Sequence, residues 1–330
     1  MYNVCMNVLP HSLRIGVIRG GTSPEYDVSL RTGANVLEHL SETHKPIDIF
    51  VSGDGTWHMH GLEKSPERIL KNVDVVFNAL HGKYGEDGEV QEILEHHGVP
   101  YTGSSRFPSA IAMNKWMVKE RVKMLGVKTP VYGVVRRTDD LGAKAKEIFN
   151  SIPHPLVVKP ANGGSSQGVS KVSSFKELLS ALENILANYD MALVEEFISG
   201  KEATLGVIDN FRSKDIYTLP LIEIVPPKDN LFDYESKYNG QSREICPGNF
   251  TDKEKREIER VSGLVHKHFG LEHYSRSDFI VSPRRGVYFL EVNTLPGLTK
   301  ESLFPKSLDA VGVSVKEFLH HVLELALKRK

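Results

Sequence analysis

Residues 14–21 read RIGVIRGG, an apolar run that ends in a pair of glycines. The run from Arg14 to Ile18 is typical of a buried strand, and Gly20-Gly21 interrupts it. A helical pattern follows, with apolar residues at spacings of three and four: Leu30, Ala34, Leu37 and Leu40. A strand, a glycine turn and a helix in this order are typical of the opening of an α/β layer.

Two more apolar runs continue this pattern, at residues 48–51 and 74–80. Their β-branched and aromatic side chains fit a buried parallel sheet. The first hundred or so residues are therefore predicted to form a small, open α/β domain.

Composition limits the class of protein. The chain has 330 residues, of which 40% are hydrophobic and 25% charged, and this suits a globular protein of two or three domains. Lys and Arg number 41 against 42 Asp and Glu. The balance disfavours a nucleic-acid-binding protein, in which basic residues are usually in excess.

Two cysteines, Cys5 and Cys246, do not make a disulfide framework, and neither has a metal-binding spacing. We expect reduced thiols in the cytoplasm. No apolar run approaches the ~20 residues of a membrane helix. Residues 1–12 lack the basic and apolar regions of a secretion signal, so they are predicted to be a short extension.

The middle of the chain predicts a helix over residues 113–125, a strand over 155–159 and another strand over 192–198. Ser174 and Glu177 predict a capping box at the start of a further helix. Near the C-terminus, Thr251 and Glu254 predict a second capping box, for a helix that stops at Gly270.

A strand is expected at residues 288–292, and the chain should end in an amphipathic helix. The apolar face of that helix carries Val315, Phe318, Leu319, Val322, Leu323 and Ala326.

A loop rich in glycine and serine follows the strand that ends at Lys159. Glycines let backbone N–H groups approach a phosphate, serines add hydroxyl donors, and Lys159 offers a charge. The loop, residues 163–168, is not a Walker P-loop, because the Gly-x-x-x-x-Gly-Lys-Ser/Thr pattern is absent. A simple turn remains the alternative.

Polar residues alternate along two predicted strands near the C-terminus. Arg276 and Asp278 share one strand face, as do Glu291 and Asn293. Asp, Glu and Asn supply the hard oxygen ligands that suit magnesium bound with phosphates. The alternative is a pair of solvent-facing polar strands, but the apolar run before Glu291 indicates burial.

Three glycine-containing segments are weaker candidates. Gly297, in a Pro-Gly turn after Asn293, could present its N–H to an oxyanion. His81 precedes the glycines of residues 82–88 and could equally be a structural histidine. Residues 20–23, which precede Glu25, lack the Gly-x-Gly-x-x-Gly spacing of a dinucleotide site, which disfavours a nicotinamide dehydrogenase.

Together these segments resemble the D-alanine–D-alanine ligase family of the ATP-grasp superfamily. The motifs that carry the resemblance occur in the family's order at residues 20–25, 81–88, 100–104, 157–160, 164–166, 233–238, 276–278 and 291–297. Each motif is weak alone, and their order and spacing make the set specific. The resemblance extends from about Arg14 to the C-terminus.

The resemblance implies an α/β (α+β) ATP-grasp fold in three domains. An open parallel-sheet domain at residues 14–112 would follow the extension at 1–13, and two α+β domains, at 113–203 and 204–330, would sandwich ATP. A homodimer is implied as well, and neither nucleic acid nor a membrane is expected as a partner.

The resemblance also implies the nucleotide site. Lys115, Lys159 and the loop with Ser165 and Ser166 would contact the phosphates, and Glu202 the ribose. The adenine would lie against four consecutive residues: Glu195, Glu196, Phe197 and Ile198. Asp278, Glu291 and Asn293 would hold two Mg²⁺ (or Mn²⁺) ions.

The same resemblance implies the substrate site. Glu25 would bind the ammonium of the first D-alanine and hydrogen-bond with Ser165 and Tyr238. Arg276 and the N–H of Gly297 would stabilise a tetrahedral intermediate. The remaining substrate-binding residues would be His81, Lys237 and Ser302.

The implied reaction is ligation of two D-alanines through an acyl phosphate, for peptidoglycan precursor synthesis. Two alternatives stay open: a D-alanine–D-lactate ligase, which the Lys237-Tyr238 pair disfavours, and a non-catalytic ATP-binding protein on the same fold. Asp27, Gln167 and Ser277 depart mildly from the family pattern. Gln167 adjoins the phosphate loop and could alter its packing.

Overall fold

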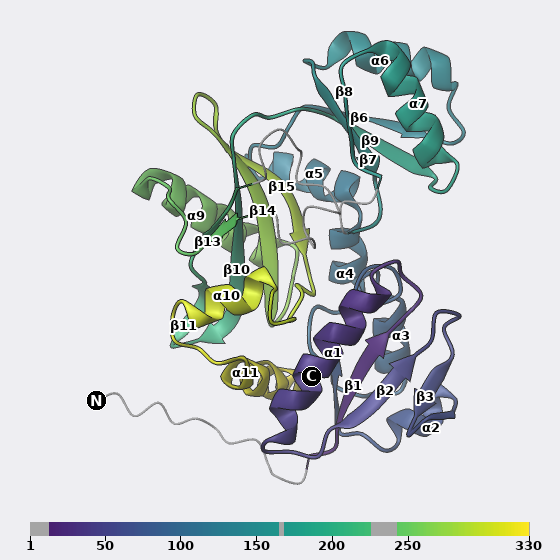
Figure 1. The fold of residues 1–330 in the computed structure, drawn as a ribbon, viewed down its shortest axis with the longest axis vertical. Helices are drawn as coiled ribbons and strands as arrows, with labels where there is room; N and C mark the ends of the chain where they lie inside the picture. Colours follow the sequence, from purple (N-terminus) through teal and green to yellow (C-terminus); the bar gives the residue numbers. More distant parts are fainter. Residues whose placement is uncertain (1–12, 165–167, 226–242, 330) are drawn as a thin grey trace.

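A computed structural model describes residues 13–164, 168–225 and 243–329. Within these residues the strands form three sheets, and the sheets make up three regions of an elongated molecule (Figure 1). None of the described helices is both long and apolar enough to span a bilayer. The mixed α/β prediction is confirmed.

The first sheet contains the strands predicted near the N-terminus. Its order is β4-β3-β2-β1-β5, with β1 (Ile15–Gly20) parallel to both β2 (Ile47–Val51) and β5 (Val75–Asn78). Strands β3 (Trp57–Met59) and β4 (Leu62–Glu63) extend it antiparallel. Three helices accompany this sheet: α1 (Tyr26–Ser41), α2 (Pro66–Leu70) and α3 (Glu89–His96).

Helix α1 forms where expected, and its buried face combines part of the predicted apolar stripe with polar side chains. Ala34 is exposed, whereas Ser29, Thr32 and Asn35 are buried. Each buried polar side chain has a hydrogen-bond partner; Ser29 Oγ, for example, donates to the Ala79 carbonyl at 2.8 Å. Leu40, from the predicted stripe, is also buried. Because hydrogen bonds offset the cost of burying polar groups, hydrophobic spacing alone located Leu40 but not the buried polar side chains.

The second sheet has the order β6-β9-β7-β8 and lies in the upper part of Figure 1. Its strands are β6 (Tyr132–Arg136), β7 (Leu156–Pro160), β8 (Ser170–Val172) and β9 (Met191–Glu196), and α6 (Leu141–Ser151) and α7 (Phe175–Leu186) pack on it. The helix predicted over 113–125 is α5 (Lys115–Met124), and a separate helix, α4 (Arg106–Met113), precedes it. The chain breaks between them because Asn114 is extended and its side chain caps α5.

Only half of the capping box predicted for α7 is present. The Ser174 side chain accepts from Glu177 N at 3.3 Å, but the Glu177 carboxylate accepts from Ser173 N, one residue earlier than a capping box requires. At Thr251 and Glu254 both halves form, as predicted.

The third sheet is antiparallel and has the order β13-β12-β10-β14-β15, with β11 paired to β10. Its strands are β10 (Lys201–Phe211), β11 (Lys214–Thr218), β12 (Ile222–Val225), β13 (Arg243–Ile245), β14 (Tyr274–Ser282) and β15 (Gly286–Asn293). Helix α9 (Asp252–His268) packs on β10, β14 and β15. The second and third sheets stand on opposite sides of the cleft described below.

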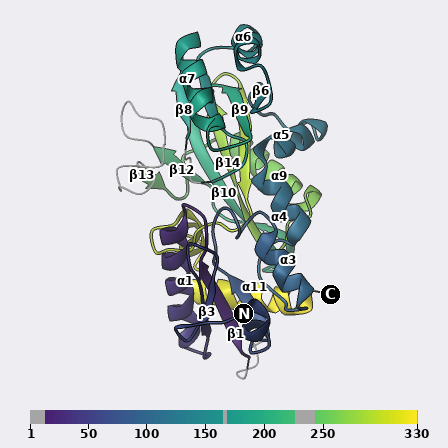
Figure 2. The same ribbon diagram turned by 90° about the vertical axis from the view of Figure 1, so that its right-hand side faces the viewer.

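The C-terminal helices return to the first sheet. After α10 (Leu303–Asp309), helix α11 (Val315–Lys328) packs against α1 and β5 (Figures 1 and 2). Its predicted apolar face is buried except at Val315, which is partly buried, and Phe318 and Leu323 join one core with Ile15 and Phe77. Each fully buried apolar side chain of this kind contributes roughly 1.5–3 kcal/mol, so α11 ties the two ends of the chain together.

The predicted domain limits stay predictions. β10 begins at Lys201, before the boundary expected at 203/204, and α11 packs on the first sheet although it falls within the predicted third domain. The extension at 1–13 lies almost wholly outside the described residues.

Candidate active site

One cleft of about 760 Å³ lies where the three sheets meet. Every described residue that the sequence nominates contributes to its lining: Glu25, His81, Lys115, Lys159, Glu195, Glu196, Phe197, Ile198, Glu202, Arg276, Asp278, Glu291, Asn293, Gly297 and Ser302. The fold therefore gathers residues from far apart in the sequence. Ser165, Ser166, Gln167, Lys237 and Tyr238 lie outside the described residues.

A tight turn brings Glu25 to the cleft. Gly20 has a φ of 96°, and a Cβ on it would lie 2.1 Å from the Val51 carbonyl oxygen, so this turn requires glycine. Glu25 follows as the N-cap residue of α1. Its carboxylate lies against the phosphate-loop candidate, because a Cβ on Gly164 would be 2.2 Å from Glu25 Oε1.

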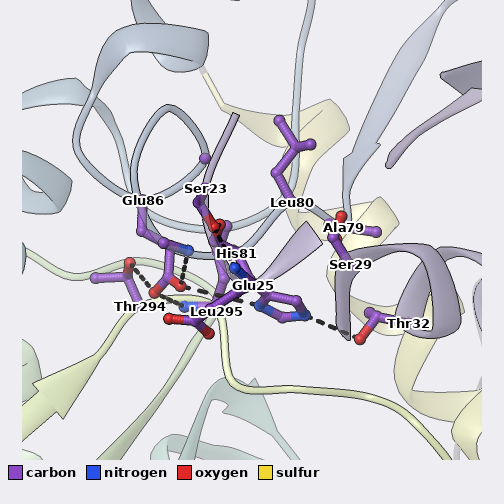
Figure 3. A network of polar contacts seen from close by, with 12 residues as sticks. Ser23, Glu25, Ser29, Thr32, Ala79, Leu80, His81, Glu86, Thr294 and Leu295 are labelled. Carbon is purple, nitrogen blue, oxygen red and sulfur yellow. Dashed lines mark hydrogen bonds and ion pairs between the residues drawn. The ribbon is translucent and has the colours of Figure 1, made fainter. Parts of the chain in front are cut away.

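His81 and Glu86 join the first sheet to the loop that follows β15 (Figure 3). His81 Nε2 pairs with Thr32 Oγ1 at 2.8 Å, and its Nδ1 lies 3.9 Å from Glu86 Oε1. The Glu86 carboxylate accepts from Gly82 N at 2.9 Å and from Leu295 N at 3.2 Å. One carboxylate thus holds together two chain segments that line the cleft.

A buried ion cluster lies on the side of the second sheet. Lys119 and Lys159 contact the two oxygens of Glu195 at 2.5 and 2.9 Å, and all three side chains are at least nine-tenths buried. Burial raises the pKa of Glu195, but the two ammonium groups outweigh it and hold that pKa below its ordinary value. Burial likewise lowers the pKa of Lys159, but Glu195 and Glu291 outweigh it and hold that pKa above its ordinary value.

Glu196, the next residue along β9, points to a different partner. Arg285, at the tip of the β14–β15 hairpin, donates to both of its oxygens, at 2.7 and 3.0 Å. Val131 N adds a third hydrogen bond at 3.1 Å. A two-pronged ion pair therefore connects the second and third sheets beside the expected adenine segment.

The polar face predicted on β14 and β15 is present. Asp278 pairs with Glu291 and Arg276 with Asn293 across the two strands. Asp278 accepts from Arg276 at 2.9 and 3.0 Å and from Asn293 Nδ2 at 3.2 Å. Lys115 Nζ lies 3.5 Å from Glu291 Oε2.

The donors on this face fit magnesium chemically. Two carboxylates and an amide oxygen are hard ligands, and Mg²⁺ usually completes its shell with water and substrate phosphates. Among the described residues no group of three or more His, Cys, Asp or Glu side chains is arranged for a metal. Asp278, Glu291 and Asn293 contain only two such side chains, and we expect water and nucleotide phosphates to supply the other ligands of a magnesium ion.

The loop after β15 leads from Asn293 to α10. Gly297 lines the cleft, and a Cβ on it would lie 2.9 Å from Ser302 Oγ. Ser302 Oγ pairs with Thr299 Oγ1 at 2.8 Å and accepts from Thr299 N at 3.1 Å. The hydroxyl is therefore held at the end of the cleft where Gly297 presents its backbone.

Sequence reasoning gave no role to three residues that contact this machinery: Glu86, Lys119 and Thr204. Thr204 Oγ1 donates to Asp278 Oδ1 at 2.5 Å. Lys119 could have been found, because it lies four residues after Lys115 on a predicted helix and therefore on the same face. Thr204 carries no such pattern.

Two sheets that face each other across a cleft lined by lysines and hard oxygen ligands define the ATP-grasp class. The description "D-ala D-ala ligase N-terminus" matches residues 61–104, and "D-ala D-ala ligase C-terminus" matches residues 122–324. The D-alanine–D-alanine ligase of Syntrophotalea carbinolica is 38% identical over 320 residues, 96% of this chain and 97% of the relative. The chain belongs to the D-alanine–D-alanine ligase family.

Another relative and two solved structures agree with this assignment. The D-alanine–D-alanine ligase of Geobacter sulfurreducens is 38% identical over 96% of this chain and 95% of its own. The Bacillus anthracis D-alanine–D-alanine ligase complexed with ATP superimposes with a TM-score of 0.80 at 32% identity, covering 97% and 98% of the two chains. The VanG D-Ala:D-Ser ligase of Enterococcus faecalis gives 0.82 at 29% identity, covering 95% and 99%.

Proposed function

We propose that this protein joins two D-alanines to D-alanyl-D-alanine at the cost of ATP, as a step of peptidoglycan precursor synthesis. The observation that carries the proposal is the cleft at the meeting point of the three sheets. Its walls combine lysines suited to phosphates, oxygen ligands suited to magnesium and a carboxylate suited to an amino group. The full-length similarity to D-alanine–D-alanine ligases supports the same substrate.

In the proposed complex, Lys115 and Lys159 neutralise the phosphates of ATP. The adenine lies beside Glu195, Glu196, Phe197 and Ile198, the ribose near Glu202, and the loop with Ser165 and Ser166 closes over the phosphates. Asp278, Glu291 and Asn293 hold two Mg²⁺ ions. When bound, these ions neutralise charge on the phosphates.

In the first step the carboxylate of one D-alanine attacks the γ-phosphorus of ATP, which gives an acyl phosphate and ADP. Glu25 accepts hydrogen bonds from the ammonium of that D-alanine and thereby orients its carboxylate. Ser165 and Tyr238 are proposed to hold Glu25, and the position of Gly164 against Glu25 supports this arrangement. Phosphoryl transfer depends mainly on such positioning and on charge neutralisation.

In the second step the amine of the other D-alanine attacks the acyl carbon, and phosphate leaves. Arg276 and the N–H of Gly297 stabilise the oxyanion of the tetrahedral intermediate. Ser302 and Lys237 bind the carboxylate of the incoming D-alanine, and His81 lies beside the first substrate. An acyl phosphate is lost to water, so the cleft must be closed during this step.

The test is phosphate release from ATP and Mg²⁺ with D-alanine, L-alanine, D-lactate or D-serine as the added substrate. Release that requires D-alanine, with D-alanyl-D-alanine identified by mass spectrometry, is the expected result. If the product were a depsipeptide, the second substrate would be D-lactate. If it were D-alanyl-D-serine, the second substrate would be D-serine. Nucleotide binding without D-alanine-dependent release would indicate a non-catalytic member of the fold.

Glu291→Gln tests the metal assignment. It should reduce turnover by at least about 10²-fold and leave the circular dichroism spectrum unchanged, because it removes the charge of one proposed ligand. Glu147→Gln, on the exposed part of α6, is the matched control. Near-normal ligation by Glu291→Gln would refute the metal assignment.

The proposal extends to the state and location of the enzyme. We expect a cytoplasmic homodimer without nucleic-acid or membrane partners. Light scattering at micromolar concentration tests the dimer, and a monomeric mass would refute it.

A further inference from the structure

Lys119 is a buried cation for which the proposed mechanism has no role. Its side chain is 0% exposed, and it sits on α5 behind the wall of the cleft. Its ammonium contacts Glu195 Oε1 at 2.5 Å and donates to Thr129 Oγ1 at 2.7 Å. Burying an ammonium group is costly, so a purely structural role could be filled more cheaply by an apolar residue.

The partner of Lys119 explains what its charge can do. Glu195 is shared: one oxygen faces Lys119 and the other faces Lys159, which lines the cleft. A lone Glu195–Lys159 pair would carry no net charge. With Lys119 the cluster carries one net positive charge, and its cleft-facing member is Lys159.

We propose that Lys119 is a positioning residue of the nucleotide site, which neutralises Glu195 so that Lys159 keeps its positive charge available for the polyphosphate of ATP. The inference rests on the proposed function, and it concerns phosphate binding alone. The adenosine part of the nucleotide gains nothing from the extra charge. Phosphate and adenosine binding should therefore respond differently to a change at Lys119.

Other groups facing Lys119 determine its charge. Burial lowers the pKa of Lys119 to about 8, with Lys159 acting in the same direction and Glu195 and Glu291 against it. Tyr132, on β6, presents its ring 5.7 Å from the ammonium. Lys119 is charged below about pH 8 and loses its proton above it, so ATP affinity should fall as the pH rises through that value.

The experiment is calorimetric titration of the whole protein with a non-hydrolysable ATP analogue and, separately, with adenosine. Lys119→Met should weaken binding of the analogue about tenfold, which corresponds to about 1.4 kcal/mol, and change adenosine binding less than about twofold. Lys123→Met is the matched control: Lys123 lies on the same helix, is exposed and approaches the same Tyr132 ring at 5.1 Å.

A pH profile separates charge from structure. Affinity of the parent protein for the analogue should fall as the pH rises through about 8, whereas Lys119→Met has no proton to lose at this position and should lack that step. If Lys119 only supported the fold, the two proteins would show the same pH profile. That result, or unchanged analogue binding by Lys119→Met, would overturn the proposal.

The same titration separates this inference from the proposed function. A wild-type protein that binds neither ligand would refute ATP use itself. A wild-type protein that binds both, together with a Lys119→Met variant that binds both equally well, would refute only the role of Lys119.

Discussion

Gly164→Ala tests whether Glu25 acts where the structure puts it. An alanine Cβ at position 164 would lie 2.2 Å from Glu25 Oε1, 3.3 Å from its Cδ and 3.8 Å from its Oε2. Gly164 has an ordinary φ, so alanine adds no backbone strain. The atom in conflict is the tip of a flexible side chain, which can rotate away, and the fold should therefore survive the change.

The size of the effect follows from that distance. The Glu25 carboxylate must move by about 1 Å to restore an ordinary contact, and misplacement on that scale can cost about 10²-fold in rate. We expect kcat/KM for D-alanine to fall about 100-fold, which corresponds to about 2.7 kcal/mol of transition-state stabilisation. The KM for ATP must be measured in parallel, because Gly164 also belongs to the phosphate-loop candidate; an effect confined to the KM for ATP would not count as an effect on Glu25.

Steady-state phosphate release at varied D-alanine and fixed, saturating ATP measures the change. Gly53→Ala is the matched control, because a Cβ on Gly53 meets no atom within 4 Å and its φ is also ordinary. Thermal unfolding of both variants should match the parent protein. If Gly164→Ala kept its kcat/KM for D-alanine, the assignment of Glu25 to the ammonium would be wrong.

Three further predictions follow from contacts around the cleft. Glu86→Gln should lower kcat about 10- to 100-fold in the same assay, because one amide oxygen cannot serve both backbone N–H groups and an unsatisfied buried donor costs about 1–3 kcal/mol. Arg285→Met should raise the KM for ATP roughly 3- to 10-fold by leaving buried Glu196 without its two-pronged partner, whereas the exposed neighbour variant Arg284→Met should not. Chelation of magnesium should weaken ATP binding at least about tenfold by calorimetry, and equal affinity with and without magnesium would contradict the assigned ligands.

Much of the fold could be predicted because it depends on local patterns. Apolar runs located β1, β5 and β15, and the amphipathic spacing located α11. On α1 the spacing located buried Leu40 but not Ser29, Thr32 and Asn35, whose side chains are buried and hydrogen-bonded to distant residues. A hydrophobicity pattern contains no information about such partners.

For the candidate site, too, some features could be predicted from the sequence and others could not. Motif order nominated side chains that prove to line one cleft, including Glu25 and Arg276, which are far apart in the chain. The ion pair of Glu196 with Arg285 could not be foreseen, because it depends on how a hairpin tip in the third sheet meets the second. The residue types indicate which ligands the cleft can bind, whereas the tertiary structure determines which side chains form ion pairs with one another.

The ion pairs in the cleft explain how its cations are stabilised when no nucleotide is bound. Lys115 faces Glu291, Lys159 faces Glu195, and Arg276 faces Asp278, so three cleft cations have a carboxylate beside them. An isolated buried charge would be costly, and these pairs avoid that cost. In the proposed complex, Glu291 and Asp278 would hold magnesium, while Lys115 would contact the phosphates and Arg276 the oxyanion. The same carboxylates that balance these cations in the nucleotide-free cleft are thus the proposed ligands of the metal, and binding would exchange partners without leaving a cleft charge uncompensated.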